Sequence, residues 1–220
     1  MKILKERYWP MKPRLNNSGR GAYELLSVAF VCLLLSCILL VTILSHVDSE
    51  KYQVFCYNAK IMALNAVNVR NNTNQKNIYL YQMIQDGLIS PIKNPFSGDD
   101  YCNIYESKVS FNGDKRSVNL QCGSYVISSS DIGDNSYSIY EVSSWVQGTR
   151  DGEVDKKTVY NIMEDKTYLL DGFYEEELAL DLFNEKYHQE FTSIKEVEKE
   201  YEVVSKEVFR SKKFVKEIEY

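Results

Sequence analysis

The chain has 220 residues, with 26 Lys and Arg against 31 Asp and Glu, which gives a formal net charge of −5. Basic residues beyond the N-terminal segment are interspersed with acids, so the sequence predicts no surface for nucleic acid. Once an N-terminal leader and a long apolar helix are set aside, roughly 150 residues remain, enough for one domain with its own core.

Residues 25–44 form an unbroken uncharged stretch, filled mostly by Leu, Ile, Val, Phe, Cys and Ala. A bilayer core is about 30 Å thick and a helix rises about 1.5 Å per residue, so about 20 such residues span it. Glu24 directly precedes this stretch, and the residues before Glu24 are basic, with six Lys and Arg against a single acid, Glu6. This charge bias predicts a cytoplasmic N-terminus and an exported segment after Ser45. A cleavable secretory signal fits less well, because its apolar region is only about 7–15 residues long.

The residues Gly19-Arg20-Gly21-Ala22-Tyr23-Glu24-Leu25-Leu26 resemble the processing site of type IV pilins and type II secretion pseudopilins. In that family a prepilin peptidase removes a short basic leader after a Gly, and the new N-terminus is methylated. A Glu follows as the fifth mature residue, before an unbroken apolar helix. The resemblance therefore implies cleavage between Gly19 and Arg20, and it implies that Glu24 serves assembly. Arg20 departs from the Phe or Met that is usual there.

Glu24 has two interpretations that do not depend on the family. A carboxylate at the edge of a hydrocarbon span is costly, so such groups usually mark function or find a partner. In a filament of such helices, that partner would be the N-terminal ammonium of a neighbouring subunit. Alternatively, Glu24 lies at the level of the lipid head groups, where a negative charge suits a helix N-terminus. The Gly at the matching offset favours the first interpretation.

The helix is predicted to continue past the membrane to about Arg70. Apolar residues recur there at spacings of three and four, as expected for one buried face of a helix. These residues are Tyr52, Cys56, Ala59, Ala63 and Ala66. Asn71-Asn72-Thr73-Asn74 is predicted to end the helix. A short helix over residues 78–87, stopped by Gly87, and a proline-punctuated loop over 88–96 follow, a succession that loosely resembles the same family.

From Cys102 onward the apolar period changes to two, which predicts strands. One strand includes Ile104, Val109 and Phe111, and a second extends from Val118 to Ile127, with Asn112-Gly113 as the hairpin turn between them. A third strand is predicted over residues 137–146. A second hairpin joins residues 158–163 to residues 167–170.

Residues 171–220 are rich in charge and carry apolar residues at helical spacing, so they are predicted to be mainly helical. Ser193 and Glu196 have the form of a capping box. Residues 208–218 are compatible with either a helix or a strand, and we predict a helix. The expected fold class is α+β, with a transmembrane helix that continues into an exported head with a small antiparallel sheet and a helical tail. The predicted parts are a leader (1–19), a spine helix (20–70), a head (71–170) and a charged extension (171–220).

Five cysteines divide between two environments. Cys32 and Cys37 lie in the predicted span, where free Cys behaves as a small hydrophobic residue. Cys56, Cys102 and Cys122 lie on the side predicted to be exported, where disulfides persist. Cys102 and Cys122 are either disulfide-bonded, which would stabilise the fold by about 3 kcal/mol on the chain-entropy model, or two free buried thiols. Cys56 is left unpaired.

No motif for catalysis or for a cofactor is found. His46 and His188 are far apart and belong to no cluster with metal-ligand spacing. Asp99 and Asp100 form a compact acidic loop that could contribute to a calcium site, but a plain turn is favoured because two acids are not a full ligand set. The sequence predicts no metal site, no cofactor and no enzyme.

The expected function is that of a pilin-like or pseudopilin-like structural subunit of a type IV pilus or a type II secretion filament. Its expected partners are the lipid membrane, homologous pilin-like subunits and a prepilin peptidase. The alternative is a signal-anchored, single-pass membrane protein with an extracellular binding domain. A membrane-tethered enzyme is a third possibility that no motif supports.

Overall fold

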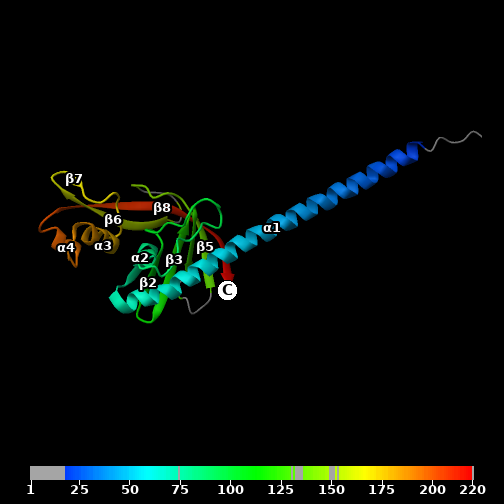
Figure 1. The fold of residues 1–220 in the computed structure, drawn as a ribbon. Helices are drawn as coiled ribbons and strands as arrows, with labels where there is room; N and C mark the ends of the chain where they lie inside the picture. The colour runs from blue at the N-terminus through cyan, green and yellow to red at the C-terminus, as the bar shows by residue number, and fades with distance from the viewer. Residues whose placement is uncertain are drawn as a thin grey trace, which may run out of the picture. The chain divides into compact units, whose positions relative to one another are not determined.

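The computed structural model describes residues 18–73, 75–129, 131, 136–148, 152 and 154–219 (Figure 1). The chain divides into two compact units, one ending at Ser49 and the other beginning at Glu50. Most of the predicted leader lies outside the described residues.

Helix α1 extends from Ser18 to Thr73, a length of 56 residues. It supplies all described residues of the first unit and the first segment of the second. The predicted continuation of the helix beyond the apolar stretch is confirmed, with an end within the Asn71-Asn72-Thr73-Asn74 segment. Charged residues after Ser45 do not interrupt the helix because Asp, Glu and Lys are tolerated on its exposed faces.

The second unit contains an eight-stranded antiparallel sheet in the order β1-β2-β3-β4-β5-β8-β6-β7. Its strands are β1 (Asn77–Tyr79), β2 (Lys108–Asn112), β3 (Lys115–Cys122), β4 (Tyr125–Ser129), β5 (Ser136–Val142), β6 (Val154–Glu164), β7 (Thr167–Tyr168) and β8 (Glu202–Glu219). Among the described residues three helices accompany it: α2 (Leu80–Gln85), α3 (Glu176–Tyr187) and α4 (Ile194–Val197).

Strand β8 joins the two halves of this sheet. Its C-terminal part pairs with β5, from Val142 opposite Lys212 onward, and its N-terminal part pairs with β6, from Val154 opposite Ser211. Phe209 exchanges backbone hydrogen bonds with Val146 (2.8 and 2.9 Å). The register also places Lys156 of β6 opposite Phe209, so β8 is bordered on both edges at this point.

Two hydrophobic clusters correspond to the two halves of the sheet. The larger cluster packs residues of the second half of α1 against β1–β5, and its fully buried members include Phe55, Met62, Leu120 and Ile139. The smaller cluster packs α3 and α4 against β6 and includes Ile162 and Phe183. The predicted α+β class is correct at this level, whereas the sheet is larger than expected.

Three sequence-based predictions for the sheet and its helices are wrong in detail. The helix predicted over 78–87 starts as strand β1, which pairs with β2, and only Leu80–Gln85 are helical. The strand predicted from Val118 to Ile127 is two strands, because Gly123 adopts φ +62° and reverses the chain. The third strand ends at Val142, four residues before the predicted end, although Val146 makes an isolated bridge.

The helix predicted over 208–218 is also wrong, since β8 occupies this segment. The mainly helical tail is therefore limited to α3 and α4, and its last strand is inserted in the sheet between β5 and β6. The predicted capping box between Ser193 and Glu196 is not formed, and Glu196 bonds to Thr192 instead. Glu196 accepts hydrogen bonds from the backbone N–H (2.7 Å) and the hydroxyl (2.8 Å) of Thr192, and Ser193 makes no side-chain cap.

Candidate functional site

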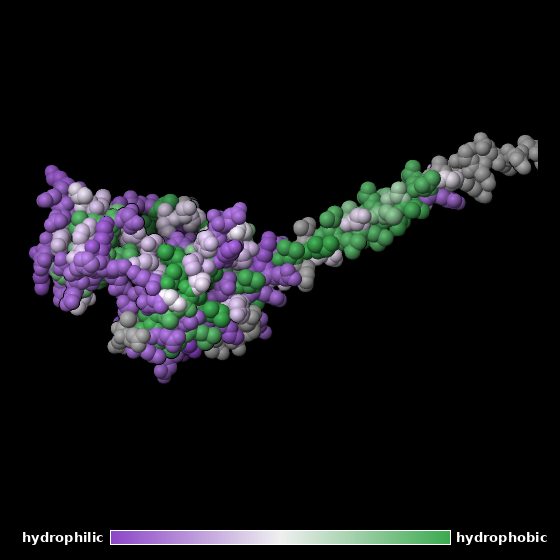
Figure 2. Space-filling model, in the orientation of Figure 1, coloured by the Kyte–Doolittle hydropathy of each residue, from purple (hydrophilic) through white to green (hydrophobic). Residues whose placement is uncertain are grey.

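The first unit presents an apolar helical surface. Large apolar side chains between residues 25 and 43 are 47% to 74% exposed on all faces of α1. Figure 2 shows this stretch as a band of hydrophobic residues. Among the described residues one helix, Tyr23–Asn71, is long and apolar enough to cross a membrane. The chain thus carries one candidate membrane-spanning helix near its N-terminus.

The polar side chains of this stretch form hydrogen bonds within the helix itself. Ser27 donates to the carbonyl of Glu24 and Ser36 to that of Cys32, each at 2.8 Å, and Thr42 donates to the carbonyl of Leu39 at 2.9 Å. Such bonds satisfy hydroxyl groups without an external partner, as hydrocarbon surroundings require.

The residues predicted to act in processing and assembly lie together at the start of α1. Gly19, Arg20 and Glu24 all fall within its first two turns. The side chain of Glu24 is exposed, on the same helix as the apolar stretch that follows it. No separate pocket or loop is needed to bring these residues close, because a helix does so by itself.

The second half of α1 packs on the sheet through small residues, as its spacing predicts. Cys56, Ala59, Ala63 and Ala66 are all fully buried in the larger cluster. Small side chains let the helix backbone approach the sheet closely, and the larger Phe55 and Met62 fill the space beside them. Burial raises the pKa of the Cys56 thiol to about 11, so this cysteine is an inert packing group.

Aromatic rings fix the proline-containing loop to α1. The ring centroid of Phe96 lies 5.3 Å from those of Tyr52 and Phe55, and 4.3 Å from that of Tyr125. Phe96 therefore lies between the helix and the sheet. Contacts of this kind add about 0.5–1.5 kcal/mol each beyond the burial of area.

Cys102 and Cys122 form a disulfide in the structure, with 4.0 Å between their Cα atoms. The bond joins the loop before β2 to the end of β3. Asn103 donates its backbone N–H to the carbonyl of Gln121 at 2.8 Å, and Cys102 donates to that of Ile92 at 2.8 Å. The cross-link and these two bonds immobilise the loop that leads to Tyr105.

The acidic loop at Asp99 and Asp100 has the contacts of a turn. The carboxylate of Asp100 accepts a hydrogen bond from the hydroxyl of Ser97 at 3.0 Å, and its backbone carbonyl accepts the N–H of Asn94 at 2.8 Å. Within the described part of the chain, no three His, Cys, Asp or Glu side chains converge as a metal site would require.

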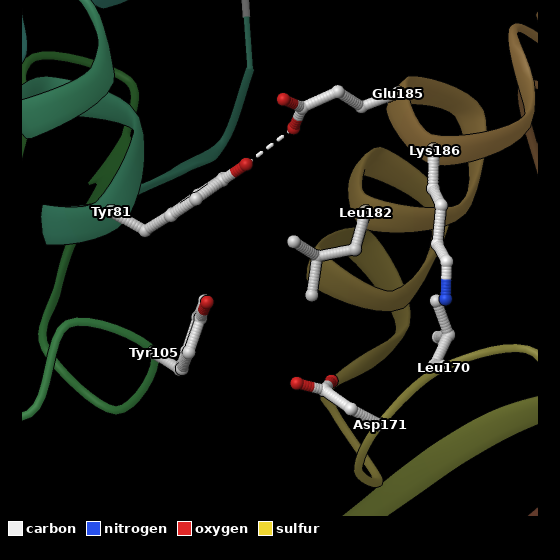
Figure 3. Close-up of a pocket in the computed structure, with 7 residues that line it drawn as sticks. All are labelled: Tyr81, Tyr105, Leu170, Asp171, Leu182, Glu185 and Lys186. Carbon is white, nitrogen blue, oxygen red and sulfur yellow. Dashed lines mark hydrogen bonds between the residues drawn. The ribbon is translucent and has the colours of Figure 1, made fainter.

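A cavity of about 430 Å³ opens between α2, α3 and two loops of the second unit (Figure 3). Its lining residues are Tyr81, Tyr105, Leu170, Asp171, Leu182, Glu185 and Lys186. Sequence reasoning did not find this cavity, because its residues come from two helices and two loops that are separate in the sequence. The sequence contains 17 Tyr residues, but this abundance does not indicate which tyrosines lie together.

A charged cluster that includes Glu106, Asp155, Lys157 and Arg210 is paired among the described residues. Lys157 donates to Glu106, and Arg210 binds Asp155 with 2.9 Å between Nη2 and Oδ2. Both cations also lie 4.4 Å from the ring centre of Trp145. These contacts connect β6 and β8 to the loop before β2, which is a structural role.

No protein-family model matches this chain, and neither a curated protein nor a solved structure shows significant similarity to it.

Proposed function

We propose that this protein is a pilin-like or pseudopilin-like structural subunit that assembles through its N-terminal helix. The observation that carries the proposal is the division of α1 into two parts. Its first part exposes apolar side chains on every face, whereas its second part buries small residues in the larger core. An exposed apolar surface of this length requires lipid or other apolar helices around it.

In this proposal the N-terminus is cytoplasmic and the head is exported. A prepilin peptidase removes the leader after Gly19, and the ammonium group of Arg20 becomes the new terminus. Glu24 then pairs with the terminal ammonium of a neighbouring subunit, because an unpaired charge at the edge of the bilayer is costly for either group. The disulfide of the head suits an oxidising compartment and supports this orientation.

The native cysteines of the span provide a direct test of assembly. Cys32 and Cys37 are exposed on α1, so mild oxidation of membranes should link neighbouring copies into disulfide dimers. Glu24→Ala should abolish the dimers and leave membrane fractionation unchanged, since it makes the span more apolar. Glu24→Gln keeps the size of the side chain and should fail equally if the charge is what matters.

The matched control is the Cys32→Ser/Cys37→Ser variant, which must yield no dimers. Wild-type levels of cross-linking in Glu24→Ala would refute the pairing mechanism. Intact-mass analysis after co-expression with a prepilin peptidase tests processing separately. A chain that retains residues 1–19 under these conditions would favour a plain signal anchor.

A second candidate function is a single-pass anchored protein whose extracellular head binds a ligand. The observation in its favour is the tyrosine-lined cavity, which has the polar and aromatic lining of a small-molecule site. Absence of cross-linked dimers in the wild type, together with an uncleaved N-terminus, would favour this candidate.

A further inference from the structure

Tyr105 lies between two other tyrosine rings, Tyr81 and Tyr174, beside the cavity. The ring centroid of Tyr105 lies 5.4 Å from that of Tyr81 and 5.3 Å from that of Tyr174, with interplanar angles of 37° and 65°. The rings are therefore inclined to one another and not stacked in parallel. Burial raises the pKa of Tyr81 to about 12 and also raises the pKa of Tyr105, so both phenols are neutral at pH 7.

Two carboxylates border these rings. Glu185 accepts hydrogen bonds from the Tyr81 hydroxyl and the Gln85 amide, and Asp171 accepts one from the Tyr174 hydroxyl at 2.5 Å. All of these donors are neutral. Among the described residues neither carboxylate forms an ion pair, so both negative charges remain uncompensated beside the cavity.

Lys186 is the one cation among the described lining residues, and it does not neutralise them. Lys186 donates its ammonium to the carbonyl of Leu169 at 2.7 Å and lies 5.4 Å from the ring centre of Tyr187. In Figure 3, Tyr81 and Tyr105 face Leu182 and Asp171 across the opening, with Glu185 at its rim. The cavity thus combines aromatic faces with a net negative charge.

Both walls of the cavity are fixed by asparagine side chains. Asn103 accepts the backbone N–H groups of Tyr105 and Glu106 at 3.0 and 3.2 Å, next to the disulfide. On the opposite wall the buried Asn161 donates to the carbonyls of Leu170 and Gly172 at 3.1 and 2.8 Å, on either side of Asp171. A site held in place before binding pays less conformational entropy when a ligand enters.

We propose that this cavity binds a small organic cation, with an alkylammonium or quaternary ammonium group against the ring of Tyr105 and between the carboxylates of Asp171 and Glu185. Aromatic faces attract cations electrostatically, and nearby carboxylates add to the attraction. The volume of about 430 Å³ accommodates a molecule of the size of choline. Binding here is independent of how α1 associates, so it can succeed or fail separately from the assembly proposal.

The test is ligand-observed NMR on the full-length protein in a maltoside detergent, with choline as the probe. Its uncharged isostere 3,3-dimethylbutan-1-ol is the matched ligand control. Choline should bind with a Kd on the order of 1–10 mM, at least about fivefold more tightly than the isostere. Glycerophosphocholine tests whether the cation can come from a lipid head group. Binding as tight as that of choline indicates that a head group can occupy the cavity, and weaker binding indicates that the cavity takes free cations.

Two kinds of variant test the contribution of the Tyr105 ring and that of the two carboxylates to choline binding. Tyr105→Leu should weaken choline binding about tenfold or more, whereas Tyr105→Phe should keep most of it. Asp171→Asn/Glu185→Gln retains the rings and should weaken choline binding to a similar extent. This double variant tests the proposal even if Tyr105→Leu does not fold. Tyr101→Leu is the control, because Tyr101 is 57% exposed and lies outside the cavity.

Equal affinity for choline and its isostere would overturn the proposal, as would unchanged choline binding in the charge-removed double variant. Binding of N-acetylglucosamine without binding of choline would also overturn it and would make the cavity a sugar site.

Discussion

Replacing Asp181 by Asn is expected to stabilise the second unit at neutral pH. Asp181 lies in the middle of α3, partly buried, and its Oδ2 accepts hydrogen bonds from Gln75 (3.1 Å) and Gln82 (2.8 Å). Glu177 and Glu185 lie one turn away on the same face of the helix. Burial raises the pKa of Asp181 from 3.8 to about 6, and repulsion by these two glutamates adds to the rise while the Gln75 bond opposes it.

The size of the effect follows from the pKa difference between folded and unfolded chains. The folded protein binds the Asp181 proton more tightly, so the stabilising contribution of this group is fully present below pH 3.8 and is lost as the pH rises through about 6. A difference of about two pKa units corresponds to at most about 3 kcal/mol, and we expect a gain of about 1–3 kcal/mol at pH 7 for Asp181→Asn. Asn keeps an oxygen acceptor for both glutamines.

The free energy of unfolding is measured by urea titration of the detergent-solubilised protein between pH 4 and pH 7, followed by the fluorescence of Trp145. The difference in the free energy of unfolding between Asp181→Asn and wild type should be near zero at pH 4 and reach its full value at pH 7. Asp99→Asn, which removes an exposed charge, is the control and should show no such pH dependence. A gain that is equal at both pH values, or a loss of stability at pH 7, would refute the reasoning.

Three further changes test which contacts stabilise the second unit. Arg210 is 4% exposed and binds both Asp155 and Gln121, so Arg210→Ala should lower the free energy of unfolding by about 3–5 kcal/mol in the same titration; a loss below 1 kcal/mol would contradict its structural role. Cys122→Ser should cost about 3 kcal/mol, and peptide mapping of the wild type without reductant should recover the linked pair; alkylation of both native thiols would exclude the bond. Ala63→Leu should cost about 1–3 kcal/mol by overpacking, whereas Leu64→Ala, at a 51% exposed position one residue on, should change stability by less than about 1 kcal/mol; similar losses in both would contradict the assigned buried face of α1.

The features that the sequence predicted correctly are those encoded by neighbouring residues. The apolar stretch of α1 and the small residues from Cys56 to Ala66 follow from one helical period, which needs no knowledge of distant segments. The hairpin at Asn112-Gly113 is likewise local, because Gly113 supplies the positive φ of 63° that the turn requires.

The features decided only by the tertiary structure depend on pairing between distant segments. Residues 208–218 carry adjacent apolar pairs among Lys and Glu, a pattern that is compatible with a helix, and hydrogen bonds to β5 and β6 make them a strand. Residues 77–79 become a strand only because β2 lies beside them. The tyrosine-lined cavity joins Tyr81 to Glu185 across 104 positions of the chain. No local period encodes such a meeting, since it is set by the way the two hydrophobic cores are joined through β8.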